Sequence, residues 1–90
     1  MSLAYRRGYN FERRVIRDLE SKGYFVARQA RSSFPDLIAI KDGEVLLIEC
    51  KVRGYLSKKE RERIEQIKAI TKAKFLVARR VKRRIVYEEC

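Results

Sequence analysis

Apolar positions near the start of the chain recur at steps of three and four residues, as they do along one face of a helix. The pattern predicts a helix that begins near Tyr5 and ends at Gly23, a residue suited to a left-handed C-cap. An aromatic and β-branched run over Tyr24–Arg28 predicts a short strand, and the polar stretch Gln29–Phe34 predicts a loop. We therefore expect a helix that leads directly into the first strand of a sheet.

The most distinctive local pattern is a pair of apolar runs joined by a two-residue turn. Asp36–Lys41 and Glu44–Lys51 are rich in Ile, Leu and Val, and Asp42-Gly43 between them suits a type I′ hairpin turn. In this register Asp36 lies directly across from Glu49. Because both faces of the hairpin are mainly apolar, we expect it to lie centrally in a sheet that is covered on both sides.

The second half of the chain predicts a helix and two further strands. Ser57 and Glu60 have the spacing of a capping box that opens a helix, and isoleucines at 64, 67 and 70 give that helix a narrow apolar stripe. Phe75–Ala78 and Ile85–Tyr87 predict strands on either side of the basic segment Arg79–Arg84. The order αβββαββ, with no repeat or linker, indicates one α/β domain over residues 1–90, with a mixed sheet flanked by helices.

Composition narrows the classes of function. The chain has 90 residues, with 23 Lys and Arg, 12 Asp and Glu, no His and a formal net charge of +11. This excess predicts binding to a polyanion, nucleic acid first, because each phosphate that Lys or Arg neutralises releases counterions. A charged surface that serves thermal stability is the alternative. The absence of histidine excludes His-based catalytic triads and His metal ligands.

The same inventory predicts the compartment. No run approaches the roughly 18 apolar residues of a membrane span, and the N-terminal residues lack the apolar block of a signal peptide. The two cysteines, Cys50 and Cys90, form no disulfide framework. These features predict a soluble, cytoplasmic protein with reduced thiols.

Three acidic residues and one lysine do not fit a purely structural account. Two carboxylates opposite each other inside a sheet repel and normally destabilise a hairpin, and Asp36 and Glu49 are such a pair. Lys51 shares the face of Glu49 because it lies two residues further along the strand. Glu12 occupies the apolar stripe of the first helix. A surface salt bridge of Lys51, and a Glu12 carboxylate that reaches the rim of the core, are the structural alternatives.

Together these residues predict a site for a hard divalent cation. Carboxylate oxygens suit Mg²⁺ or Mn²⁺, and the cation offsets the repulsion between the acids. Mg²⁺ held by Asp36 and Glu49 would polarise a phosphodiester and lower the pKa of an attacking water. Lys51 would hold that water or the developing negative charge. The pattern predicts metal-assisted phosphodiester hydrolysis.

The same residues form a family motif. Pro35-Asp36, followed after twelve residues by Glu49-Cys50-Lys51, resembles the PD-(D/E)xK nuclease signature, with Glu12 on a preceding helix. Over most of the chain the sequence resembles the archaeal Holliday junction resolvases in particular. The stretches that carry this resemblance are the basic N-terminus with Gly8, Phe11-Glu12-Arg13, Gly23–Arg28, a serine-containing loop, Pro35–Ala39 and Leu47–Lys51.

This resemblance implies a restriction-endonuclease-like fold and a Mg²⁺-dependent homodimer that cuts two opposed strands of a four-way DNA junction. Mn²⁺ is expected to substitute for Mg²⁺. The site residues that the resemblance implies are the acids Glu12, Asp36 and Glu49, the Cys50 carbonyl as a further metal ligand, the catalytic Lys51 and the loop residue Ser32.

Basic residues that flank these elements are candidates for DNA contacts, with a solvated surface as the alternative. They are Arg6, Arg7, Arg28, Arg31, Lys58 and Lys59. The last two open the second helix, where backbone N–H groups also favour phosphate. Arg79–Arg84 either contacts DNA or protects an edge strand from aggregation. Phe34 in the loop is expected to be free to stack on exposed bases, whereas Phe25 is expected to pack in the core.

Two other functions stay open from the sequence. One is a nuclease with the same metal chemistry that acts on flap, end or restriction-type substrates. The other is a basic DNA-binding protein without catalysis. The leading prediction is an endonuclease that resolves four-way junctions.

Overall fold

The computed structural model describes residues 3–30 and 34–90 of the chain, with side chains from residue 8 onward. Within this part the elements follow in the predicted order αβββαββ. They are α1 (Leu3–Ser21), β1 (Phe25–Arg28), β2 (Leu37–Lys41), β3 (Glu44–Lys51), α2 (Lys58–Thr71), β4 (Lys74–Val81) and β5 (Arg84–Glu89). Neither helix is long and apolar enough to cross a membrane.

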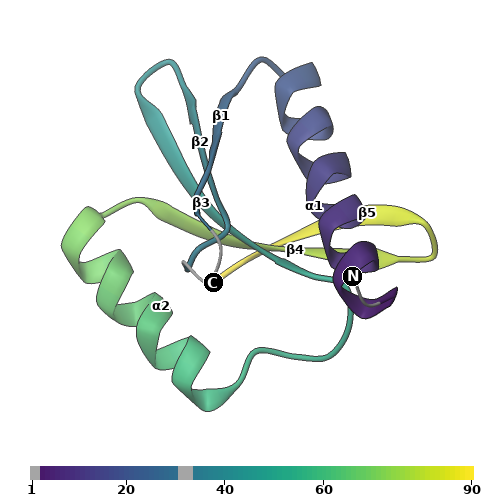
Figure 1. Cartoon of the computed structure of the whole chain (residues 1–90). Coiled ribbons are helices and arrows are strands. Elements are labelled where there is room, and N and C mark those ends of the chain that lie inside the picture. Colours follow the sequence, from purple (N-terminus) through teal and green to yellow (C-terminus); the bar gives the residue numbers. More distant parts are fainter. Residues whose placement is uncertain (1–2, 31–33) are drawn as a thin grey trace.

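The strands form one mixed sheet in the order β1-β2-β3-β4-β5 (Figure 1). β3 and β4 are parallel, and the other neighbouring strands are antiparallel. The β2–β3 hairpin has the predicted register, with Lys41 opposite Glu44 and Leu37 opposite Ile48. α2 is the crossover that parallel neighbours require. β3 therefore lies at the centre of the sheet, as its apolar faces predict.

Each face of the sheet is buried against one helix, because side chains alternate along the strands. Figure 1 shows the sheet between α1 and α2. The α1 side of the core consists of Phe11, Val15 and Leu19 packed with Leu37, Ala39, Leu46, Ile48 and Ala78. The α2 side is smaller and centres on Leu47, Ile64 and Phe75. The central hairpin is thus covered on both sides, as predicted.

The ends of the helices follow the sequence signals. Ser57 Oγ accepts a hydrogen bond from the Glu60 N–H at 3.0 Å, and Glu60 Oε1 accepts one from the Ser57 N–H at 2.8 Å, which completes the predicted capping box. Gly23 follows α1 with φ +93°, a conformation that side chains disfavour. Both predicted helix boundaries are confirmed.

The C-terminal hairpin is longer than the sequence indicates. β4 and β5 continue through the basic segment Arg79–Arg84, which is therefore no separate loop, and only Lys82-Arg83 turns, with φ 48° and 68°. Such turns usually contain Asn or Gly, and because this one contains neither, the sequence did not predict it. Arg14 Nη2 on α1 donates to the Arg83 carbonyl at 2.7 Å and holds the turn against the helix.

Two aromatic residues lie where the sequence did not predict them. The ring of Phe34 stacks on Phe75, with centroids 5.6 Å apart, and packs on the α2 side of the core. Phe25 is 68% exposed on the edge strand β1, opposite Ile40, which is 38% exposed. The expectations of a free Phe34 and a buried Phe25 are both wrong. Phe34 packs in the core although it lies in a loop, whereas Phe25 stays exposed because it lies on the edge strand of the sheet.

Candidate metal and catalytic site

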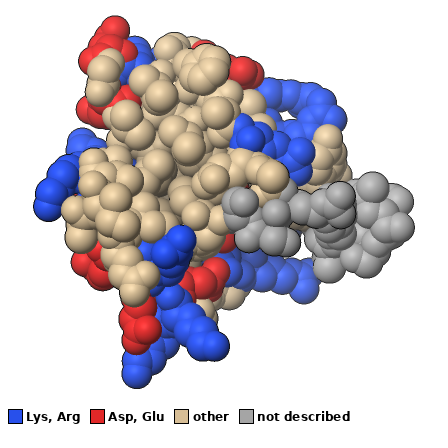
Figure 2. Space-filling model, turned by 60° about the vertical axis from the view of Figure 1, so that its left-hand side comes forward, with Lys and Arg blue, Asp and Glu red and all other residues tan. Residues whose placement is uncertain are grey.

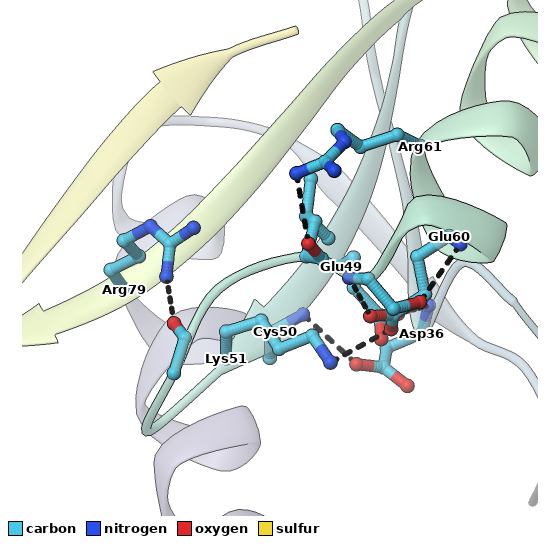
Figure 3. A network of polar contacts seen from close by, with 10 residues as sticks. Asp36, Glu49, Cys50, Lys51, Glu60, Arg61 and Arg79 are labelled. Carbon is cyan, nitrogen blue, oxygen red and sulfur yellow. Dashed lines mark hydrogen bonds and ion pairs between the residues drawn. The ribbon is translucent and has the colours of Figure 1, made fainter.

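Two carboxylates meet where β2 begins and β3 approaches its end. The backbone N–H of Asp36 donates to Glu49 Oε1 at 3.2 Å, and the backbone N–H of Cys50 donates to Asp36 Oδ2 at 2.9 Å. Figure 3 shows these side chains together with that of Lys51. The hairpin register brings the two acids together in the predicted way.

Glu49 is the buried member of the acid pair, whereas Asp36 is half-buried. Glu49 is 9% exposed, and among the described residues no other charged side chain is buried. Burial raises the pKa of Glu49 to about 8, and the charge and hydrogen bond of Asp36 act in the same direction, while the charge of Lys51 opposes them. A buried carboxyl with this pKa needs a proton or a cation to neutralise it near pH 7.

Lys51 lies beside the acids and is tied to the start of α2. Its Nζ is 2.7 Å from Glu60 Oε2, and both side chains are about three-quarters buried, with 24% and 25% exposed. The capping-box glutamate therefore holds the lysine as well as the helix. The sequence predicted only the capping role. In the sequence, the ion pair of Glu60 with Lys51 is indicated only by the short separation between Lys51 and the capping glutamate.

Glu12 approaches the site from the other face of the sheet. Its side chain is 15% exposed and forms an ion pair with Arg28 of β1. The thiol of Cys50 lies on this face, where burial raises its pKa and the charges of Asp36, Glu12 and Glu49 raise it further.

The structure therefore brings together only part of the predicted cluster of acidic residues. No group of three or more His, Cys, Asp or Glu residues in the described part of the chain is placed to hold a metal ion. Asp36 and Glu49 are together, whereas Glu12 is paired with a guanidinium on its own face, because a charge-assisted hydrogen bond to Arg28 is within reach.

The residues predicted to contact DNA are divided by the structure. Lys58 and Lys59 are exposed in the first turn of α2, next to Glu60. Arg28 packs its guanidinium 5.2 Å from the centroid of the Tyr9 ring. The backbone of Arg6 and Arg7 belongs to α1, but their side chains are not described, and Arg31 and Ser32 lie outside the described residues.

Comparison with protein families gives a match over nearly the whole chain. The model of the archaeal Holliday junction resolvase (Hjc) matches residues 3–88. The chain belongs to this family. The family assignment predicted from the motif is thereby confirmed.

Two relatives place the chain within the archaeal Holliday junction resolvase family. The crossover junction endodeoxyribonuclease Hjc of Methanocaldococcus jannaschii is 44% identical over 64 residues, which cover 67% of this chain and 48% of that protein. The chain thus spans about half the length of this curated relative. The solved structure of Archaeoglobus fulgidus Hjc, a Holliday junction resolvase from an archaeal hyperthermophile, matches with a TM-score of 0.74 and 26% identity, over 86% of this chain and 74% of that chain. The predicted restriction-endonuclease-like α/β fold is confirmed by this similarity.

Proposed function

We propose that this protein is a Mg²⁺-dependent, structure-selective DNA endonuclease that resolves four-way junctions by paired phosphodiester cuts. The observation that carries the proposal is the contact of the buried Glu49 with Asp36 beside Lys51, at the ends of two central strands. Membership of the archaeal Holliday junction resolvase family and the names of two relatives support the junction as substrate.

The donor set fits a hard divalent cation. Asp36 and Glu49 offer adjacent carboxylate oxygens, and the raised pKa of Glu49 reflects its burial and the nearby charge of Asp36, both of which such a cation would offset. Asp36 and Glu49 would hold Mg²⁺ or Mn²⁺, with Glu12 and the Cys50 carbonyl as further ligands. When bound, the cation supplies Lewis-acid activation of the phosphodiester and of water.

The remaining roles belong to residues around the acid pair. Lys51 is the proposed catalytic lysine, whose ammonium donates hydrogen bonds to the attacking water or to the phosphate oxygens as negative charge develops. Glu60 positions this ammonium before substrate binds, through the 2.7 Å ion pair. Ser32 is proposed to act in the loop near the site.

DNA binding is assigned to the basic residues around the site. The proposed contacts are Arg6, Arg7, Arg28, Arg31, Lys58 and Lys59. Lys58 and Lys59 combine their own charge with the backbone N–H groups of the first turn of α2. Two free cysteines are compatible with action in the reducing cytoplasm.

A homodimer is part of the proposal, because two opposed cuts require two active sites related by a two-fold axis. Figure 2 shows one face of the molecule on which Lys, Arg, Asp and Glu lie mainly around the periphery and uncharged residues fill the middle. Two chains of net charge +11 meet with least repulsion over such a face. Sedimentation of the complex with a junction tests this part, and a stable monomer on DNA would contradict it.

The experiment that tests the function compares a four-way junction with its linear arms, with and without Mg²⁺, and maps the cuts on all strands. We expect paired, symmetric cuts in the junction and intact linear duplex. Asp36→Asn and Lys51→Ala should bind the junction without cutting it, while Glu89→Gln, a change on the exposed surface of β5, should cut normally.

Two results would contradict the proposal. Equal cleavage of flaps, ends or linear duplex would indicate a nuclease with a different substrate. Junction binding with no cleavage in either Mg²⁺ or Mn²⁺ would indicate a DNA-binding protein without catalysis.

A further inference from the structure

The loop between β3 and α2 holds an exposed aromatic ring next to the candidate site. Tyr55 is 87% exposed, more than any other large hydrophobic residue in the described part of the chain. Its neighbours in the loop are fixed from two sides. Arg79 Nη1 donates to the Gly54 carbonyl at 2.5 Å, and Arg61 Nη1 donates to the Leu56 carbonyl at 3.1 Å (Figure 3). The ring is therefore presented to solvent by a braced backbone.

Arg79 connects this loop with β3, the strand that carries Lys51. In the parallel β3–β4 pair, Arg79 lies opposite Lys51, so their side chains share one face of the sheet. The guanidinium of Arg79 lies 5.3 Å from the centroid of the Tyr55 ring, and an ion pair with Glu88 holds it there. Tyr55 thus packs against a residue of β4 that lies directly opposite the proposed catalytic lysine on β3.

The surroundings of Tyr55 match the chemistry of a nucleotide. A cation on one side of an aromatic ring is typical of surfaces on which bases stack, and Arg53, Lys58 and Lys59 nearby in the chain are exposed. Phe25 is the matched contrast. It is also strongly exposed, but it lies on the edge strand β1 opposite Ile40, and an apolar neighbour offers nothing to a phosphate.

We infer that Tyr55, backed by Arg79, stacks on a nucleobase exposed at the branch point of the bound DNA. The inference rests on the proposed function and adds to it the residue that distinguishes branched from linear DNA. In a continuous duplex both faces of each base are covered by neighbouring bases, whereas stacking is interrupted where strands exchange. A ring fixed next to Arg79, close to the candidate site, therefore gains a stacking partner only in the branched substrate.

The test measures DNA affinity of the full chain in Ca²⁺ without Mg²⁺, using a four-way junction and one of its linear arms. Tyr55→Ala should weaken junction binding about five- to hundredfold, the range for loss of one base–aromatic stack. Its affinity for the linear arm should change less than twofold. Tyr55→Phe keeps the ring, and Phe25→Ala removes an exposed ring elsewhere. Both variants should bind the junction with the affinity of the parent, the unsubstituted protein. Junction binding by Tyr55→Ala within twofold of the parent, or an equal loss on the linear arm, would overturn the inference.

A second measurement identifies the contact directly. A junction with 5-iodouracil at the branch point, irradiated in the complex, should crosslink to the peptide that contains Tyr55, and the crosslink should be absent from Tyr55→Ala. A crosslink confined to another peptide would overturn the inference. Arg79→Lys keeps the charge but not the paired hydrogen bonds, so it should reduce the crosslink yield at Tyr55 while circular dichroism stays that of the parent.

Cleavage by the parent protein separates the two proposals. A parent that crosslinks through Tyr55 but never cuts in Mg²⁺ or Mn²⁺ retains the stacking contact and contradicts the nuclease. A parent that cuts the junction while Tyr55→Ala cuts and binds equally well contradicts the stacking contact alone.

Discussion

The β2–β3 and β4–β5 hairpins have similar turns but carry different charged contacts between their strands. Asp42-Gly43 turns with φ 50° and 80°, and Lys82-Arg83 turns with φ 48° and 68°. At the open end of β2–β3, Asp36 meets a second acid, Glu49. Midway along β4–β5, Arg79 meets the opposite charge of Glu88.

The Arg79–Glu88 contact stabilises its hairpin, whereas the Asp36–Glu49 contact is not explained by stability. An ion pair of Arg79 and Glu88 favours the hairpin, if only slightly, because the pair is partly exposed. The Asp36–Glu49 pair opposes its hairpin, since the burial of Glu49 and the like charge of Asp36 raise the pKa of Glu49 to about 8. A feature of two central strands that works against the fold is the kind of feature expected at a functional site, which agrees with the proposed role of the acid pair.

The strongest test of this contrast is Glu49→Gln, an uncharged replacement of the same shape. We expect junction cleavage in Mg²⁺ to fall on the order of a thousandfold, because loss of one carboxylate ligand removes several kcal/mol of transition-state stabilisation. In EDTA the free energy of unfolding should be unchanged or higher by about 1 kcal/mol, because the repulsion is removed. Cleavage assays and urea unfolding measure both. A variant that loses stability in EDTA would show that the acid pair is structural.

The second test concerns a tie between α1 and the β4–β5 hairpin. Tyr87 donates its hydroxyl to Asp18 Oδ2 at 2.6 Å, and this hydrogen bond, with that of Lys22, lowers the pKa of Asp18. Tyr87→Phe should lower the free energy of unfolding by about 1 to 2 kcal/mol at pH 7.

The pH dependence of this loss has a defined sign. Because the pKa of Asp18 is lower in the folded state, its contribution is fully present above the pKa of an unfolded aspartate, roughly 4, and is lost as the pH falls through the lowered value. The difference between parent and Tyr87→Phe should therefore shrink in acid. A difference that stays constant down to pH 2 would contradict the assignment to the Asp18 charge.

The two turns provide the third test. Replacing Lys82-Arg83 by Asn-Gly should raise the free energy of unfolding by about 1 kcal/mol, because neither new residue is strained at positive φ. The Arg83 carbonyl that accepts from Arg14 is backbone and is kept. The reverse exchange, Asp42-Gly43 to Lys-Arg, should lower stability by a similar amount. Thermal unfolding measures both variants, and equal melting temperatures for all three proteins would show that the turns carry no such strain.

The smallest effect is expected at the ion pair between β4 and β5. Glu88→Gln should lower the free energy of unfolding by about 0.5 kcal/mol at low salt, since Glu88 is 55% exposed and its ion pair with Arg79 is screened. The loss should disappear in 1 M salt, as measured by urea unfolding. A loss above about 2 kcal/mol would place this pair among the main supports of the fold.

Most of the fold was predictable because local signals agree with the tertiary structure. The Asp-Gly turn set the β2–β3 register, and that register alone brought Asp36 to Glu49. The capping box fixed the start of α2. The Lys82-Arg83 turn was missed because neither residue is typical of positive φ, and its support comes from Arg14, a contact across 69 positions of sequence.

The candidate site was predicted less completely, since its outer partners depend on packing between elements. Glu60 was identified as a cap, but its ion pair with Lys51 follows from how α2 returns over the sheet. Glu12 was identified as an anomaly within an apolar stripe, but its partner Arg28 depends on the α1–β1 contact. Arg79 looked like one of several basic residues until its parallel pairing with Lys51 distinguished it.

Glu60 uses its two oxygens for two different tasks. Oε1 accepts the hydrogen bond from the Ser57 backbone, whereas Oε2 faces the ammonium of Lys51. Because the tasks are divided between atoms, the amine can swing away toward an incoming phosphate without fraying the first helical turn. The ion pair of Lys51 with Glu60 can therefore break while the hydrogen bond that caps α2 stays in place.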